Sequence, residues 1–161
     1  MITVRQPLDL DSANMARLLN EIIEIGGATS LTRPVTGDDL NQWMASNSDQ
    51  SAWHVALDEY EKVVGFQWIS PHPQLPAEAC DIATFVQVGR TGLGIGSALF
   101  SATSAAAKQL GYVWINARIR TDNSGGLIYY QSRGFRDWHF DEGVSLTSGQ
   151  IVDKISKRYD I

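Results

Sequence analysis

Three glycines that alternate with bulky residues form the segment of this chain best suited to chemistry, Gly92-Leu93-Gly94-Ile95-Gly96. The segment follows a β-rich run, Ile82 to Val88, and opens a predicted helix that continues to about Leu110. Glycine lets a backbone turn tightly and bring its N–H groups against a ligand. The first turn of the helix adds free N–H groups and the positive end of the helix dipole. The sequence therefore predicts a cradle for a phosphate-bearing molecule.

Other phosphate-binding motifs fit this segment poorly. A dinucleotide fingerprint needs G-x-G-x-x-G in the first βα unit and an acidic residue about 20 positions later. Here the spacing is G-x-G-x-G in mid-chain, and the next predicted strand, Tyr112 to Ala117, ends without a suitable carboxylate. No Gly-Lys-Ser/Thr follows, which excludes a P-loop. A flexible strand-to-helix turn without a ligand remains an alternative.

A second segment, further along the chain, predicts a helix with recognisable ends. Asn123 is suited to be its N-cap, Gly134 to stop it, and Phe135 to begin another strand. Gly125 and Gly126 fall in the first turn, where each costs roughly 1 kcal/mol relative to Ala. We therefore expect the start of this helix to be soft.

Together the two segments resemble the GNAT superfamily of acyl-CoA-dependent N-acyltransferases. The family's Gln/Arg-x-x-Gly-x-Gly/Ala motif falls on Thr91 to Gly96. Its Asn-x-x-Ala-x-x-x-Tyr-x-x-x-Gly-Phe motif falls on Asn123 to Phe135. The resemblance covers Asp81 to about His139 at the level of motifs, and the whole chain in the order of its elements.

Two positions depart from the family pattern. Thr91 stands where the family prefers Gln or Arg, although Arg90 is adjacent, and Gly126 replaces the usual Ala. Both changes imply weaker binding of the cofactor's phosphates. Asn20 and the Thr121-Asp122-Asn123 approach make the chain most similar to the phosphinothricin and methionine-sulfoximine acetyltransferases.

The resemblance implies acetyl-CoA as the co-substrate and no metal. It also implies a fourth strand that carries a bulge and splays from the fifth, so that pantetheine lies between them. A backbone N–H of that strand would polarise the thioester carbonyl, and the pyrophosphate would lie on the N–H groups from Leu93 through Ser97. The cofactor-binding residues implied in this way are Phe85, Val86, Thr91, Gly92, Leu93, Gly94, Ile95, Gly96, Ser97 and Asn123.

The family's tyrosine position falls on Tyr130, which the resemblance implies as the general acid for the CoA thiolate. A phenol of pKa ~10 can protonate a thiolate of similar basicity; packing of the helix is the alternative role. Tyr129 lies about 100° around the helix and is interpreted as packing. Asp81 resembles in position a glutamate of the phosphinothricin enzymes and is the candidate base. Glu78 competes for that role, and a purely structural Asp81 is the alternative.

The remaining aromatic and histidine residues give weaker indications. Trp68 and Trp138 are the tryptophans suspected of walling an acceptor pocket, and His72 and His139 are the histidines most suited to touch a substrate. His54 is interpreted as structural. No spacing of His, Cys and acidic residues indicates a metal site.

Composition limits the class of protein. The 161 residues predict one domain, 1–161, with its own core. A net charge of −5 without a basic stripe argues against nucleic acid as a partner. No apolar stretch predicts a membrane span, and no signal-peptide pattern is present. Cys80 is the single cysteine, which favours a reducing cytoplasm. The resemblance implies a homodimer.

The predicted elements follow the order β-α-α-β-β-β-α-β-α-β-β. This order is the one that the resemblance implies: a mixed α/β GNAT fold, in which four helices cover both faces of a mostly antiparallel sheet of about seven strands. The predicted strands are about 2–6, 53–57, 63–69, 79–88 and 112–117, one from 135, and 151–159. The predicted helices begin near Asp9 or Asp11, at a Thr36 capping box, at the glycine loop and after Asn123.

The resemblance implies direct transfer of an acetyl group to the primary amine of a small, amino-acid-like acceptor. A loop from about Gly26 to Val35 is expected to line the acceptor site, with Arg33 either holding a carboxylate or solvated. Two alternatives remain: an acyl-CoA sensor without turnover, and acetylation of protein N-termini or lysines. The long connection from Asp141 to Gln150 favours a covered pocket over an open peptide groove.

Overall fold

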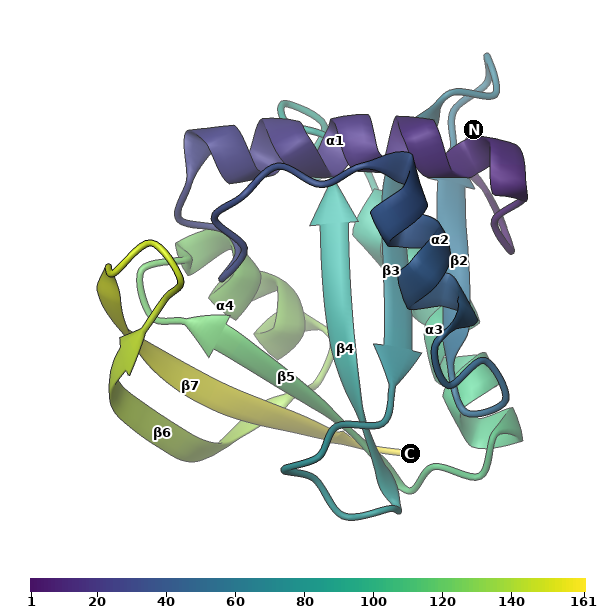
Figure 1. Ribbon diagram of the computed structural model, residues 1–161. Helices are drawn as coiled ribbons and strands as arrows, with labels where there is room; N and C mark the ends of the chain where they lie inside the picture. Colours follow the sequence, from purple (N-terminus) through teal and green to yellow (C-terminus); the bar gives the residue numbers. More distant parts are fainter.

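Strands and helices follow one another as the sequence predicts, and the computed structural model describes all 161 residues (Figure 1). The strands are β1 (Thr3–Arg5), β2 (Ala52–Leu57), β3 (Val63–Ser70), β4 (Ala79–Val86), β5 (Trp114–Arg120), β6 (Arg136–Ser145) and β7 (Ile151–Asp160). The helices are η1 (Asp9–Asp11, a 3-10 turn), α1 (Ser12–Ile25), α2 (Gly37–Ala45), α3 (Ile95–Gln109) and α4 (Ser124–Ser132). None of them combines the length and the apolar content that crossing a membrane would need.

All seven strands join one sheet in the order β1-β2-β3-β4-β5-β7-β6. Every neighbouring pair is antiparallel except β4 and β5, which are parallel. The predicted mixed, mostly antiparallel sheet of the GNAT fold is therefore confirmed.

Helices α1 and α2 cover one face of β2, β3 and β4. The apolar residues of α1 recur on a single side, so Met15 and Leu19 are fully buried against Phe66 of β3. Helix α2 begins at the predicted capping box. Thr36 Oγ1 accepts from the Asp39 N–H at 3.1 Å, and Asp39 Oδ2 accepts from the Thr36 N–H at 2.9 Å.

Helices α3 and α4 cover the opposite face, and Figure 1 shows α3 behind the sheet from the side of α1 and α2. Ile95 and Leu99 of α3 are buried against Val64 of β3. Further along the same face, Phe100 packs in a second cluster with Ile115 of β5. Helices on both faces were predicted and are confirmed.

Strand ends differ from the prediction where tertiary contacts decide them. The chain before β5 is still completing the α3 turn, because the Tyr112 N–H donates to Ala107 O at 3.1 Å. The strand therefore begins at Trp114. Its ladder with β7 extends it to Arg120, which pairs with Lys154.

The hairpin of β6 and β7 also differs from the prediction. The connection expected over 141–150 is mostly strand, because β6 continues to Ser145, which pairs with Ile151. Only residues 146–150 form the turn.

Strands β4 and β5 pair over three residues only, from Ala79 and Trp114 to Asp81 and Asn116. Beyond that pair the strands separate, as Figure 1 shows, because β4 continues along β3 and β5 along β7. The predicted splay is confirmed. The expectation of a bulge in β4 is wrong, since the register of β4 against β3 runs without interruption from Asp81 to Val86. We call the region between the separated strands the β4–β5 opening.

Candidate active site

Two backbone units of β4 face the β4–β5 opening. In an antiparallel pair, alternate residues direct their N–H and C=O groups to the same neighbour. The Gln87 N–H donates to Val64 O at 2.9 Å, so the backbone N–H and C=O groups of Gln87 and Phe85 point toward β3. Those of Thr84 and Val86 therefore point into the opening, where no strand pairs with them. Val86 agrees with the expected pantetheine contact, whereas the peptide of Phe85 faces the other way.

The glycine loop presents free backbone donors at the far end of the same opening. Gly92 and Gly94 have backbone φ angles of 83° and 81°, which residues with a side chain rarely adopt. A Cβ built on either glycine would have no atom within 4 Å. Gly94 caps α3 without any side-chain bond, and the first helical bond runs from the Ala98 N–H to Gly94 O at 3.0 Å. The N–H groups at the start of α3 thus have no intrahelical acceptor, which suits them to an anion. The Ile95 side chain is 1 % exposed and fixes this turn to the core.

Tyr129 of α4 and Arg133, the residue that follows α4, stand against this loop. The sequence indicated no role for Arg133 and only packing for Tyr129. The Tyr129 hydroxyl donates to Gly96 O at 2.7 Å, and a Cβ at Gly96 would lie 2.6 Å from Tyr129 Cε1. The interpretation of Tyr129 as packing is therefore incomplete. Arg133 Nη1 donates to Ser97 Oγ at 2.6 Å, and its buried Nε has no partner. A guanidinium thus stands at the start of α3.

The neighbouring positions of the two motifs have defined partners. Arg90 approaches Asp58 at 3.6 Å, so it is turned toward the β2–β3 connection and does not replace the Gln or Arg missing at the exposed Thr91. Asn123 caps α4 as predicted, because its Oδ1 accepts from the Gly126 N–H at 3.0 Å. Its Nδ2 also donates to Ala28 O at 3.3 Å.

Tyr130 approaches the β4–β5 opening from the side of α3 and α4. Its ring is buried in the core cluster of that face, and its hydroxyl lies 2.8 Å from Thr84 Oγ1. Thr84 is three positions beyond Asp81, the last residue of β4 that pairs with β5. Burial raises the pKa of the Tyr130 phenol above its usual value, and the nearby Asp81 charge adds to this. The hydroxyl is therefore protonated at neutral pH.

Asp81 lies on the opposite face of the sheet. Cys80 and Ile82 point into the α3–α4 core, so the side chain between them points to the other side. Asn116 Nδ2 donates to Asp81 Oδ1 at 3.0 Å, and Trp138 Nε1 donates to Asn116 Oδ1 at 2.9 Å. Burial raises the pKa of the Asp81 carboxyl, and the Asn116 hydrogen bond opposes the shift. The competing Glu78 is exposed and lies outside the cavity described next.

A cavity of about 350 Å³ opens in front of Asp81. It mixes acidic, basic and aromatic side chains, in which Arg118 Nη2 and His139 Nε2 each lie 3.1 Å from the Asp141 carboxylate. Its lining residues are His72, Gln74, Leu75, Asp81, Asn116, Arg118, Trp138, His139, Asp141 and Ser156. Most of them come from β5, β6 and β7, on the face that no helix covers.

Only some of the residues expected to line an acceptor pocket lie around this cavity. Trp138, His72 and His139 line it, as the sequence suggested. Trp68 instead stacks on Trp53 with 4.1 Å between ring centroids, in the core beneath α1. His54 lies in β2, where burial lowers the pKa of its imidazole.

Residues 26–36, the connection between α1 and α2, are fastened across β5 and β7. Arg120 Nη1 donates to Thr29 O at 3.0 Å, and Lys154 Nζ donates to Ser30 Oγ at 2.5 Å. Thr32 Oγ1 lies 2.5 Å from Thr147 Oγ1 in the β6–β7 turn. The connection therefore lies beside the uncovered face, but none of its residues lines the cavity in front of Asp81. Arg33 is exposed and lines no described cavity.

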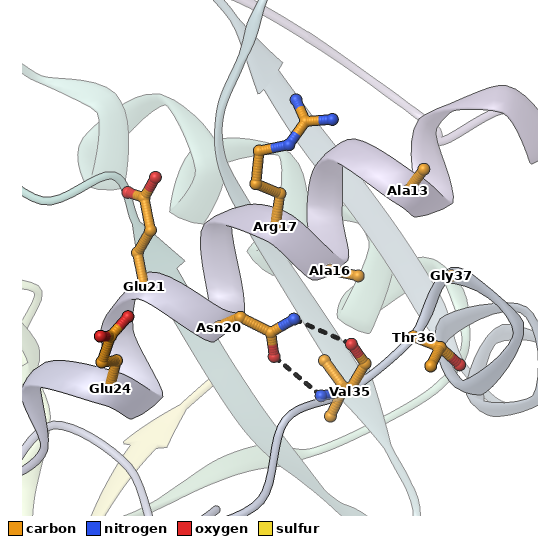
Figure 2. A pocket seen from close by; sticks show the side chains of 9 residues that line it. All are labelled: Ala13, Ala16, Arg17, Asn20, Glu21, Glu24, Val35, Thr36 and Gly37. Atoms are coloured by element: carbon orange, nitrogen blue, oxygen red, sulfur yellow. Dashed lines mark hydrogen bonds between the residues drawn. The ribbon is translucent and has the colours of Figure 1, made fainter.

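A second, wider depression of about 430 Å³ lies along α1 and is structural. Figure 2 shows Asn20 reaching from α1 to the backbone of Val35, with Arg17, Glu21 and Glu24 beside it. Asn20 Nδ2 donates to Val35 O at 2.9 Å, and its Oδ1 accepts from the Val35 N–H at 2.7 Å. This clamp holds the end of the 26–36 connection to α1.

Comparison with known proteins agrees with this fold. The model of the acetyltransferase (GNAT) domain matches residues 49–137, and the chain belongs to this family of acetyl-CoA-dependent enzymes. The phosphinothricin N-acetyltransferase of Streptomyces coelicolor is 28 % identical over 142 residues, which cover 84 % of this chain and 82 % of that protein.

Other relatives share part of the sequence or the fold alone. The mycothiol acetyltransferase of Kocuria rhizophila is 32 % identical over 90 residues, 54 % of this chain but only 30 % of that protein's length. A phosphinothricin acetyltransferase of Sinorhizobium meliloti, solved with acetyl-CoA, has a TM-score of 0.88 at 20 % identity and covers 99 % of this chain and 88 % of its own. A ribosomal-protein-alanine N-acetyltransferase of Brucella melitensis has a TM-score of 0.89 at 20 % identity, with 99 % of both chains covered.

Proposed function

We propose that this protein transfers the acetyl group of acetyl-CoA directly to the primary amine of a small acceptor. One arrangement carries the proposal. A protonated phenol, Tyr130, and a half-buried carboxylate, Asp81, approach the same β4–β5 opening from opposite faces of the sheet. An acid and a base separated in this way can serve the two ends of a single acyl transfer.

The chain's own groups suit the co-substrate. Thr84 and Val86 offer an unpaired strand edge to the amides of pantetheine, and the N–H groups from Leu93 through Ser97 offer donors to the pyrophosphate. Arg133, beside Ser97, adds a positive charge at the phosphate end. Bound acetyl-CoA supplies an activated thioester, whose carbonyl an N–H of β4 can polarise.

Proton movements follow from the two side chains. Asp81 accepts a proton from the acceptor's ammonium, directly or through a water, which frees the lone pair that forms the new C–N bond. Its raised pKa brings this base closer to neutral pH. Tyr130 donates its proton to the sulfur as the C–S bond breaks, and CoA leaves as the free thiol. The second proton that the nitrogen loses as the amide forms restores the Tyr130 phenol through solvent, and the proton on Asp81 is released to solvent.

Direct transfer is favoured over an acetylated enzyme. Cys80 is the only cysteine, its side chain is fully buried, and burial raises the pKa of its thiol to about 12. A thiol that is protonated and closed off from the cavity is a poor nucleophile.

A small, amino-acid-like amine is the acceptor that the cavity supports best. Asp81 and Asp141 give it two carboxylates suited to an ammonium, and Arg118 gives it a cation. The phosphinothricin relative, which this chain matches over most of its length, acts by its name on a small molecule. The contact between Thr32 and Thr147 narrows the approach that a peptide would need. The proposal also includes a single domain over residues 1–161, a cytoplasmic location and a homodimer.

The first test is the melting temperature with and without acetyl-CoA. At about 100 times its dissociation constant, a ligand adds about 2.7 kcal/mol, which raises Tm by roughly 5–11 °C for a domain of this size. Absence of a shift would remove both the enzyme and the sensor interpretations.

Thiol release then separates the functions. Amino acids, methionine sulfoximine and simple amines are compared with a peptide of free N-terminus, each with acetyl-CoA. The proposal expects release with a small amine and little with the peptide, and a fall of roughly 10²-fold or more in Tyr130→Phe with its Tm shift retained. Binding without release from any amine would favour the sensor, and preferred release with the peptide would favour protein acetylation.

A further inference from the structure

A row of buried and half-buried polar side chains stands behind the β4–β5 opening and connects the glycine loop to Tyr130. It consists of Tyr129 and Tyr130 from α4, Gln67 from β3 and Thr84 from β4. Gln67 Nε2 lies 3.1 Å from the Tyr129 hydroxyl and 2.8 Å from Thr84 Oγ1. Thr84 Oγ1 lies 2.8 Å from the Tyr130 hydroxyl. The row begins at Gly96 O, which accepts from Tyr129 at 2.7 Å.

The directions of the first hydrogen bonds in this row follow from its first member. A carbonyl oxygen only accepts, so the single hydrogen of the Tyr129 hydroxyl goes to Gly96 O. The Gln67 atom that faces Tyr129 must then be the donor nitrogen, and the same nitrogen gives its second hydrogen to Thr84 Oγ1. The Tyr130 oxygen is the one acceptor within hydrogen-bond distance of the Thr84 hydroxyl, so we assign the last bond as donated by Thr84.

Tyr130 consequently accepts from Thr84 and keeps its own hydrogen free. The side chain has no other hydrogen-bond partner in the chain, and Thr84 lies on the part of β4 that has left β5. We propose that Gln67, Thr84 and Tyr129 are positioning residues that turn the Tyr130 hydrogen toward the substrate in the β4–β5 opening. This inference rests on the proposed function.

An unpaired atom supports this assignment. Gln67 is fully buried, and its Oε1 has no hydrogen-bond partner. Leaving a buried acceptor unpaired costs free energy, and such groups in folded proteins call for an explanation. Here the Gln67 amide is oriented so that its nitrogen makes both donor bonds, and its oxygen is left without a partner. This orientation gives the hydrogen bonds of the row a fixed direction.

The row also favours the product of proton donation. Once Tyr130 has given up its hydrogen, the Thr84 hydroxyl donates to the phenolate, and a hydrogen bond to the charged form eases its formation. Without Thr84, the phenol could turn its hydrogen away from the sulfur and would lose the donor that stabilises its anion.

The test replaces Thr84 by Val, which keeps the branched shape and removes the hydroxyl. We expect kcat to fall roughly 3- to 10-fold with KM for acetyl-CoA and the acetyl-CoA Tm shift unchanged, and Thr84→Ser to restore kcat. Gln67→Leu should act in the same direction. Thr103→Val is the control, because it removes a fully buried hydroxyl that lies on α3 and has no hydrogen-bond partner.

A double-mutant cycle shows whether the effect passes through Tyr130. In the Tyr130→Phe background, Thr84→Val should have no further effect on kcat, because there is no phenolic hydrogen left to orient. An additive loss, or a wild-type kcat in both Thr84→Val and Gln67→Leu, would overturn the positioning role and leave the proposed function intact. A wild-type enzyme that releases no thiol with any amine would overturn both.

Discussion

Strands β2 to β4 are covered by helices on both faces, whereas β5 and β7 are covered on one face only and β6 is mostly exposed. In the first region, the side facing α1 is apolar and includes Leu19 and Phe66, both completely buried. In the second region, the same side of the sheet carries Asn116, Arg118 and Ser156 around a cavity. The two regions meet where β4 and β5 share only three residue pairs.

This difference separates the source of stability from the place of chemistry. Burial of apolar surface in the first region contributes most to the free energy of folding. The second region keeps polar groups on an accessible face because its backbone is already paired within the sheet. Asp81, at the boundary, is held by the first region and faces the cavity of the second.

The largest effect is expected at that boundary. Asp81→Asn removes the proposed base while its amide oxygen still accepts from Asn116, so turnover should fall roughly 10²-fold or more. Thiol release with the best amine is the measurement. Retention of more than a tenth of the wild-type rate would remove Asp81 from the mechanism and point to a water or to another group.

The same substitution should stabilise the fold, with a definite pH dependence. Burial raises the pKa of Asp81 in the folded state, so the ionised carboxylate destabilises the fold once the pH exceeds that pKa. At pH 7.5 the Tm of the wild-type protein should therefore be lower than that of Asp81→Asn. The difference in Tm should vanish as the pH falls toward 4. A Tm difference independent of pH would contradict the assignment.

Next in size is a substitution within the covered region. Leu19→Ala should cost about 2–5 kcal/mol, because a fully buried leucine leaves a cavity under α1. His139→Ala, on the uncovered face, should change stability by no more than about 0.5 kcal/mol. Urea unfolding of both variants measures the contrast, and equal costs would refute the division into two regions.

A smaller effect is expected where α4 meets the glycine loop. Gly96→Ala would place a Cβ 2.6 Å from the Tyr129 ring, so the loop or the ring must shift, at a cost of about 1–3 kcal/mol. We expect a lower Tm and a raised dissociation constant for acetyl-CoA, measured by calorimetry. Unchanged affinity would show that the loop tolerates the shift without losing its donors.

The smallest effect is a gain. Gly125 lies within α4, and a Cβ there would meet only Asn123 Oδ1 at 3.9 Å, so Gly125→Ala should stabilise by up to about 1 kcal/mol. Gly126→Ala is the contrast, since its Cβ would lie 2.4 Å from Asn123 Nδ2 and disturb the cap. The pair is compared by thermal melting, with turnover of Gly125→Ala expected to match the wild type.

Local signals made much of this fold predictable. The apolar spacing of α1, the capping box at Thr36 and the Asn123 cap depend on residues close together in sequence, and each is confirmed. The direction of the Phe85 peptide was not predictable in this way. It depends on the uninterrupted register of β4 against β3, which only pairing decides.

The site was predictable in its motifs and not in its surroundings. Tyr130 and Asp81 stand at the same opening, and their roles stay predictions. Arg133 was missed because its approach to Ser97 depends on how α4 crosses α3, across 36 positions of sequence. For Tyr129 the sequence offered one indication, because a tyrosine packed against a glycine is a common close contact. Its partner Gly96 lies on another helix, so the sequence spacing did not identify it.

The hydrogen bonds that hold residues 26–36 in place affect how the substrate preference of this protein could change. Two of the bonds across β5 and α4 end on main-chain oxygens, those of Ala28 and Thr29, which every amino acid supplies. The side chain at 28 can therefore be exchanged during evolution, or in a directed library, without loss of the bond that holds the connection. At 29 the bond to Arg120 survives an exchange, but the Thr29 hydroxyl also accepts from the Leu31 N–H at 3.2 Å. Ser30 differs from both, because its own hydroxyl accepts from Lys154. Diversity should accumulate at 28, less at 29, and be most restricted at 30.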